Sequence, residues 1–392
     1  MKVRIIVVLA LLSCFTVALA QEETTQGYKP SSTQFMIRGY AHAGFEYQAV
    51  DGDARSTFLG SSFVPIFIFK PSDRLLFEAE LGFFYNSRNE VEVSFEYADV
   101  SYIVNDYIIL RMGKFMLPFG TFTERLHPAW INRLSNAPLG FGHGGIAPAA
   151  GTGVEVRGAI PVGSAKLLYY VYAVNGPRLN TGVDEPEEAG QLMFENLIDN
   201  NNNKAFGGRL GLLPFSNSSL ELGASVYGGT VGDRNDSLYS NVGALLYAFD
   251  LSYVRQLSAV RGILDIKAQY NINNVDQATY FEEELDGSFT PYTFNNSSNA
   301  SFAQLSYRPT MAGNDIVKNF ELVGRYSNFQ APEGAEWEQQ STQWSFGINY
   351  WLSWRTVFKV NYQSTVQQGG HGVPAGETVT TNGLFVHWAM GF

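Results

Sequence analysis

The sequence predicts an all-β, transmembrane antiparallel β-barrel, and three observations support this prediction. Polar and apolar residues alternate with a period of two through most of the 392 residues, and successive side chains of a strand point to opposite faces. The connections between alternating segments include short and long ones in turn, as in barrels that span a membrane. The chain ends on an apolar face shared by Trp388, Met390 and Phe392, which we expect to act as an assembly signal.

The alternation defines sixteen candidate strands, and it is clearest where Leu264, Ile266 and Ala268 alternate with Asp265 and Lys267. The aromatic residues at the ends of the apolar faces favour a membrane barrel over a soluble sandwich. Broken alternation between Tyr97 and Tyr102 leaves 14 or 18 strands as alternatives and indicates a bulge. The predicted strands are 34–49, 56–70, 74–86, 90–104, 106–116, 151–161, 165–175, 204–214, 219–230, 240–255, 260–274, 300–308, 317–329, 341–353, 355–366 and 380–392.

The first twenty residues have the pattern of an export signal. Lys2 and Arg4 precede an apolar run, and Ala18-Leu19-Ala20 fits a cleavage site after Ala20. A lipoprotein signal at Cys14 is the alternative. We expect residues 1–20 to be removed, 21–33 to form a short periplasmic tail and 34–392 to form a single outer-membrane barrel. A barrel of this kind places the protein in the outer membrane of a Gram-negative bacterium, among its lipids and lipopolysaccharide, after insertion by the barrel-assembly machinery.

Composition excludes several classes of protein. The net charge of -11 argues against a nucleic-acid partner. The single Cys excludes a disulfide framework, and the five His show no metal-ligand spacing, so we expect neither a metal nor a cofactor. An enzyme with a nucleophile beside a base would have to use His127, His143 and Ser135, which no catalytic motif supports. The short segment before the first strand leaves no room for a plug domain.

The connection 117–150 is the longest and is rich in apolar residues. Long loops of this kind are usually functional. We expect it to fold inward after the fifth strand and to narrow the lumen, although an external lid or a subunit contact would also explain its composition. The expected constriction residues are Glu124, Arg125, Trp130 and Arg133.

Charged residues recur on the face of the strands opposite the apolar face. Burying them without water would be unfavourable, whereas a barrel of sixteen strands encloses an aqueous channel. The residues expected to line that channel are Arg38, Glu46, Glu78, Glu80, Glu92, Arg111, Glu155, Arg157, Arg209, Glu221, Asp265, Lys267, Glu321, Arg325 and Lys359.

Several short motifs resemble those of phosphate-selective porin O/P-like outer-membrane proteins. The stretch 110–120 contains Gly113-Lys114 followed by Pro118-Phe119-Gly120, and 172–176, 204–210, 324–326 and 349–350 also fit. The resemblance implies a 16-stranded porin that is commonly a homotrimer. Anion-selective relatives are expected to have clustered basic residues in the constriction, whereas the loop 117–150 contains only Arg125 and Arg133, with Glu124 beside them.

These observations together predict a porin for the passive diffusion of small hydrophilic solutes or ions, with anions such as phosphate as one class, and no enzyme. The alternative is a non-conducting surface or accessory protein that binds through acidic external loops. The densest acidic clusters are 184–188 and 282–284. They would solvate the loops, bridge to lipopolysaccharide through divalent cations or attract cationic solutes.

Overall fold

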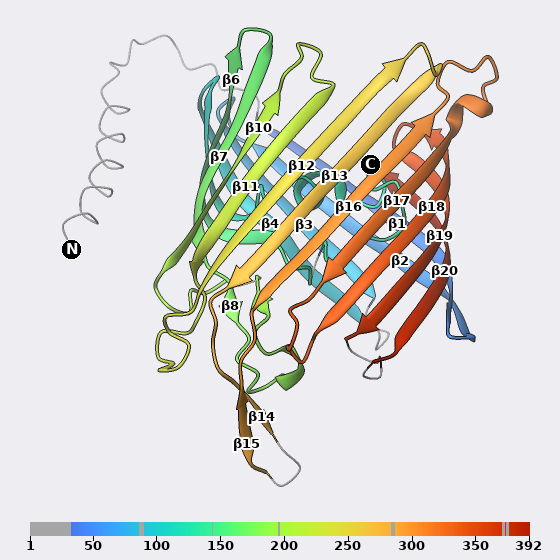
Figure 1. The fold of residues 1–392 in the computed structure, drawn as a ribbon. Coiled ribbons are helices and arrows are strands. Elements are labelled where there is room, and N and C mark those ends of the chain that lie inside the picture. Colours follow the sequence, from blue (N-terminus) through green and yellow to red (C-terminus); the bar gives the residue numbers. More distant parts are fainter. Residues whose placement is uncertain are drawn as a thin grey trace, which may run out of the picture.

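A computed structural model describes residues 33–85, 90–142, 144–194, 197–283, 287–370, 373 and 376–392. Sixteen strands form one closed antiparallel barrel, in which neighbours in space follow one another along the chain (Figure 1). The prediction of sixteen strands is therefore confirmed, and the alternatives of 14 and 18 are wrong. The predicted segment 1–20 and all but the last residue of the predicted tail 21–33 lie outside the described residues.

The barrel strands lie close to their predicted bounds. The largest differences are three residues. Pairing starts at Asp53 and Ser297 rather than at 56 and 300 and continues to Gly369 rather than 366, whereas two other strands start at Gly243 and Phe320 rather than at 240 and 317. The strands are β1 (Gln34–Val50), β2 (Asp53–Lys70), β3 (Leu75–Tyr85), β4 (Val91–Asn105), β5 (Ile108–Met116), β6 (Ala150–Val162), β7 (Ala165–Asn175), β10 (Lys204–Leu213), β11 (Leu220–Thr230), β12 (Gly243–Leu257), β13 (Gly262–Val275), β16 (Ser297–Arg308), β17 (Phe320–Gln330), β18 (Gln339–Ser353), β19 (Thr356–Gly369) and β20 (Thr378–Gly391).

The barrel closes where β1 pairs with β20. At this seam Phe392 N donates to the Gly39 carbonyl at 2.9 Å, and Gly39 N donates to the Phe392 carbonyl at 3.2 Å. The ring of Phe392 stacks on that of Phe63, with centroids 5.7 Å apart. The terminal residue thus takes part in both the hydrogen-bond ladder and the aromatic packing of the seam.

The broken alternation in β4 corresponds to a bulge. Glu80 of β3 is paired with Tyr97 of β4, whereas the next residue, Leu81, is paired with Phe95. Glu96 is the extra residue, and its side chain is buried. The bulge lets Glu96 and Tyr97 both avoid the outer face, which strict alternation forbids.

The two ends of the barrel differ in the length of their connections. At one end the strands are joined by short turns, apart from the connection 309–319 between β16 and β17. At the other end the long connections gather, at the bottom of Figure 1. Two of these contain small hairpins that the sequence did not predict: β8 (Arg178–Leu179) with β9 (Leu192–Met193), and β14 (Tyr280–Glu283) with β15 (Phe289–Tyr292). In the described part of the chain, three single-turn helices also occur outside the barrel strands: η1 (Phe122–Leu126), η2 (Pro186–Glu188) and η3 (Val317–Asn319).

The two faces of the wall differ as the alternation predicts. On β13 the side chains of Asp265, Lys267, Gln269 and Asn271 are buried. Tyr270, which points to the opposite face, is exposed. Outward side chains along the wall are mostly apolar and exposed, which fits a surface solvated by lipid rather than water. No helix in the described part of the chain is long and apolar enough to cross a membrane.

Candidate functional site

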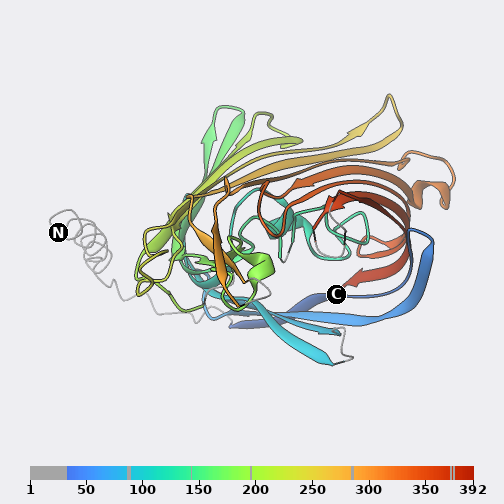
Figure 2. The same ribbon diagram turned by 60° about the horizontal axis from the view of Figure 1, so that its bottom comes forward.

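The candidate site is the interior of the barrel together with segment 117–149, which joins β5 to β6. Figure 2 shows this teal segment within the ring of strands when the barrel is viewed toward the long connections. Gly120 N donates to Ser225 Oγ on β11 at 3.0 Å, and Thr121 N and Phe122 N both donate to Gln269 Oε1 on β13. The start of the segment is therefore held by two strands far from β5 in the sequence.

Two of the expected constriction residues form an ion-pair chain with the wall. Glu124 Oε1 lies 2.6 Å from Arg157 Nη2 on β6. Arg125 Nη1 lies 2.9 Å from Glu221 Oε2 on β11, and Arg125 Nη2 donates to Tyr170 Oη at 3.1 Å. Each guanidinium is thus balanced by a carboxylate, so the charges of these two ion pairs cancel.

Arg133 lies between two carboxylates of the wall. Its Nη2 is 3.5 Å from Asp265 Oδ2, and its Nε is 3.4 Å from Glu321 Oε1. The guanidinium also covers the ring of Trp351 at 5.0 Å from the centroid. Such a contact orients a cation and reduces its access to a passing anion.

Trp130 packs against the wall. Its ring meets that of Trp354 edge to face, with centroids 6.5 Å apart. It also packs against the buried cluster of Trp351, Val357 and Ala389. Trp130 therefore anchors segment 117–149 to β18, β19 and β20.

Two fully buried cations bind backbone carbonyls of the same segment. Lys359 Nζ donates to the carbonyl oxygens of Ala129 at 2.5 Å, Asn132 at 2.6 Å and Leu134 at 3.3 Å. Arg325 Nη2 donates to the carbonyl of Asn136 at 2.8 Å. These two side chains therefore hold the middle of the segment, a role that the sequence did not reveal.

Neutral wall residues complete the attachment. Ser135 N and Oγ both donate to Asn361 Oδ1, Asn136 Nδ2 donates to Gln363 Oε1, and Asn349 Nδ2 donates to the Arg133 carbonyl. The sequence marks these wall residues only as polar residues on the inward face. Alternation does not show which segment each of them would bind.

An apolar cluster packs the segment against β16. The rings of Phe122, Phe141 and Phe302 meet edge to face at centroid distances of 5.0 to 5.7 Å. Ile146 and Ala300 are buried in the same cluster. Phe122, Phe141 and Ile146 of this segment are therefore buried against the wall rather than exposed to water.

The other expected lumen residues fall into two groups. One group is buried: Glu80, Glu155, Arg209, Asp265, Lys267 and Glu321. Arg209 forms ion pairs with Asp250 and Glu221, and Arg111 forms ion pairs with Asp99 and Glu155. The sequence did not reveal two of these carboxylates, Asp99 and Asp250. Arg38 and Glu92 are exposed near opposite ends of the wall, and Glu46 and Glu78 are half-buried.

The side chains considered for catalysis are held apart by their hydrogen bonds. His127 Nδ1 lies 2.5 Å from the Thr123 carbonyl, and its Nε2 lies 3.4 Å from Tyr40 Oη and 3.7 Å from Glu80 Oε1. The Ser135 hydroxyl donates to Asn361 instead. His143 lies outside the described residues. Within the described ranges no group of three or more His, Cys, Asp or Glu side chains is arranged to hold a metal ion.

The long connections present acidic residues at the mouth of the barrel. Burial, together with the neighbouring Glu282, raises the pKa of Glu336 above its ordinary value. Negative charges gathered at this end raise the local concentration of cations and lower that of anions.

No protein-family model matches the sequence, and no curated protein matches it. Solved structures do match over most of the chain. They include the outer membrane channel DcaP of Acinetobacter baumannii, with 13% identity over 93% of this chain and 99% of that chain and a TM-score of 0.57. An anion-selective porin from Comamonas acidovorans has 14% identity over 92% of this chain and 100% of that chain, with a TM-score of 0.55.

Salmonella typhi OmpF in complex with daunomycin matches with 11% identity over 92% of this chain and 98% of that chain, and its TM-score is 0.57. Likeness at such low identity concerns the arrangement of the backbone. The chain therefore has the closed-barrel fold of these outer-membrane channel and porin structures.

Proposed function

We propose that this protein is a passive outer-membrane channel for small hydrophilic solutes. The observation that carries the proposal is the inward face of the sixteen-stranded barrel, which holds ion-paired charges along its length. Barrels of this size leave an aqueous lumen, and water there solvates charges that would otherwise be costly to bury. The exposed apolar outer face complements a bilayer. No catalytic step is part of the proposal.

Segment 117–149 is proposed to narrow this channel, with Glu124, Arg125 and Arg133 facing the solute path and Trp130 as an anchor. Its hydrogen bonds to β11, β13, β17, β18 and β19 support this role. A loop fastened on several sides of a lumen limits the size of the solutes that pass.

Selectivity for phosphate, which the motif resemblance implies, has little support from the charges. Arg209, Arg325 and Lys359 are each 1% exposed, and Arg125 and Arg133 are paired with carboxylates. A phosphate ion needs accessible basic groups to replace its water. We therefore propose a general pore with a preference for cations or neutral solutes.

The surroundings of the protein follow from the same proposal. We infer an outer-membrane location in a Gram-negative bacterium, removal of residues 1–20 after Ala20, and insertion by the barrel-assembly machinery. Trp388, Met390 and Phe392 are proposed as the assembly signal. A homotrimer and contacts between acidic loops and lipopolysaccharide are further parts of this proposal.

Liposome swelling tests the proposal directly. Vesicles that contain the refolded chain 21–392 should swell in small sugars, with a rate that falls as the sugar becomes larger. Protein that migrates as a folded, heat-modifiable barrel but gives no swelling would favour the alternative, a non-conducting surface or accessory protein.

A further inference from the structure

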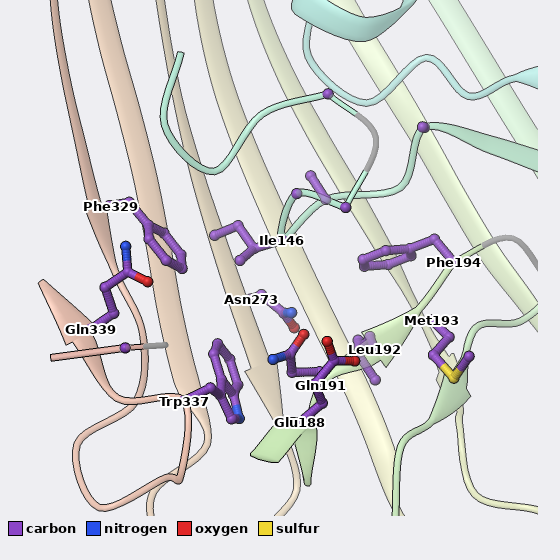
Figure 3. A pocket seen from close by; sticks show the side chains of 16 residues that line it. Ile146, Glu188, Gln191, Leu192, Met193, Phe194, Asn273, Phe329, Trp337 and Gln339 are labelled. Carbon is purple, nitrogen blue, oxygen red and sulfur yellow. The ribbon is translucent and has the colours of Figure 1, made fainter. Parts of the chain in front are cut away.

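A pocket of about 460 Å³ lies beside segment 117–149 toward the long connections. Its walls come from the end of that segment, from the connection between β7 and β10, from β13, from the β17–β18 connection with its flanking residues, and from Gly370 after β19. Pockets that bind small ligands have volumes of roughly 300–1,000 Å³. Figure 3 shows the side chains that line it, including Trp337, Phe329, Phe194 and Gln191.

The lining combines aromatic surfaces with amide groups. Phe194, Phe329 and Trp337 supply the rings, and Gln191, Asn273 and Gln339 supply the amides. Each amide presents both donors and acceptors. The described lining contains no Lys, Arg or His side chain, and its one carboxylate, Glu188, also interacts with other groups.

Asn273 carries an unused hydrogen-bond acceptor. Its side chain is 6% exposed, and its Oδ1 accepts no hydrogen bond from the described part of the protein. A buried amide oxygen without a partner is unfavourable, so a donor is expected to reach it. In the view of Figure 3 this side chain lies between those of Trp337 and Phe194.

Hydrogen bonds between connections hold the walls in place. Trp337 Nε1 donates to the Ala189 carbonyl at 2.9 Å, and Ala331 N donates to the Gln339 carbonyl at 2.8 Å. Gln191 N donates to the Glu188 carbonyl at 3.0 Å. A wall that is ordered before the ligand arrives loses less conformational freedom on binding.

We propose that this pocket binds a short neutral carbohydrate before it passes the constriction. A sugar ring has an apolar face that packs on aromatic rings and a rim of hydroxyl groups that both donate and accept, which the amides match. The described lining has no basic side chain, which disfavours binding of phosphate. Its one carboxylate, Glu188, already interacts with other groups, so a charged amine would lose its bound water with little in return. The inference rests on the proposed channel function because it names a solute class for the channel.

Binding and transport are measured separately. Isothermal titration calorimetry of the folded chain 21–392 in detergent with glucose, maltose and maltotriose measures binding, whether or not the protein conducts. The same sugars are then added to the outer face of a bilayer in which the channel conducts ions. Inorganic phosphate and ethylamine serve as the charged probes.

We expect saturable binding of at least one sugar, with current block at the same concentrations and weaker binding of both charged probes. Trp337→Ala and Asn273→Leu should each raise the dissociation constant about tenfold. Trp344→Ala is the matched control because Trp344 is an exposed residue of the outer face of β18. This variant should bind as the wild type does.

Absence of saturable sugar binding would overturn the inference, as would tighter binding of phosphate or ethylamine. Equal affinity of the wild type, Trp337→Ala and Asn273→Leu would place any binding elsewhere and would also overturn it. Because Trp337 also holds the Ala189 carbonyl, Asn273→Leu decides the question if the Trp337 variant fails to fold. Sugar binding without ion conductance would support the pocket and contradict the channel.

Discussion

The most deeply buried cations of the barrel have polar partners on the wall or in segment 117–149. Arg209 has no exposed side-chain surface, and its guanidinium donates to Asp250 and Glu221 at 2.6 to 3.0 Å. Lys359, equally buried, uses carbonyl oxygens of segment 117–149. A buried cation with no such partners would be strongly destabilising. These residues therefore stabilise the wall and the loop, and they are withdrawn from contact with solutes.

At this scale we predict that Lys359→Met lowers the free energy of unfolding by about 2–4 kcal/mol, because it leaves buried carbonyl oxygens without a donor. Urea unfolding of the refolded barrel in detergent micelles measures the change. The control is Lys166→Met, near the turn between β6 and β7, where Lys166 is exposed. That variant should change the free energy by no more than about 0.5 kcal/mol. Equal effects of the two variants would contradict the role of Lys359.

At the scale of elements, segment 117–149 is the part that we propose to limit which solutes pass. Its backbone and side chains bind five strands of the opposite wall, and its aromatic residues pack on β16. A loop held in so many places acts as a fixed restriction rather than a flexible lid.

Deletion of residues 124–146 should therefore increase the single-channel conductance and admit larger sugars in the swelling assay. The control is deletion of 281–291, which removes most of the β14–β15 hairpin among the long connections. That deletion should leave the conductance unchanged. A folded 124–146 deletion with wild-type conductance would show that the loop does not form the constriction.

The β14–β15 hairpin gives a prediction of pH dependence. The ring of Tyr280 stacks on those of Tyr239 and Phe294 at 5.8 and 5.2 Å. Burial, with the neighbouring tyrosines, raises the pKa of Tyr280 to about 12, and burial, with Glu336 and Glu282, raises the pKa of Tyr292 to about 12. Because the folded state favours the neutral phenols, their contribution to stability is present below pH ~10 and is lost as the pH rises to about 12.

Ultraviolet absorbance of phenolate during an alkaline titration measures this behaviour. The late part of the titration, near pH 12, should shrink in Tyr280→Phe and in Tyr292→Phe. Titration curves that lost only an early component in both variants would contradict the raised pKa values.

The strands and their faces could be predicted because alternation depends on local geometry, and Asp265 and Lys267 were placed on the inward face by period two alone. The bulge at Glu96 was visible as a break in the pattern, but its exact register depends on the pairing with Glu80. The carbonyls bound by Lys359 depend on how segment 117–149 crosses the interior. Nothing local in the sequence encodes that path.

The same distinction applies to the candidate site. Arg125 and Arg133 were expected at the constriction from their loop, yet the carboxylates that neutralise them lie on β11, β13 and β17. The aromatic and amide pocket joins five parts of the chain that are distant in sequence. Such sites arise only when the barrel closes.

At the scale of the whole molecule, we propose a water-filled barrel with an acidic mouth and few accessible cationic side chains. The net charge of the chain is -11, and acidic connections gather at one end. Such a distribution attracts cations and repels anions over about a Debye length. Current through the channel should therefore be carried mainly by cations, and the preference should weaken as the salt concentration rises.

Single-channel recording of the refolded chain 21–392 in a planar bilayer is the decisive test of channel function. Under a potassium chloride gradient, we expect stepwise openings with a reversal potential of the sign expected for cation flow. Addition of millimolar phosphate should leave the current unblocked, whereas block would restore the phosphate-selective alternative. A folded, heat-modifiable protein that gives no conductance steps would contradict the claim that this barrel is a channel.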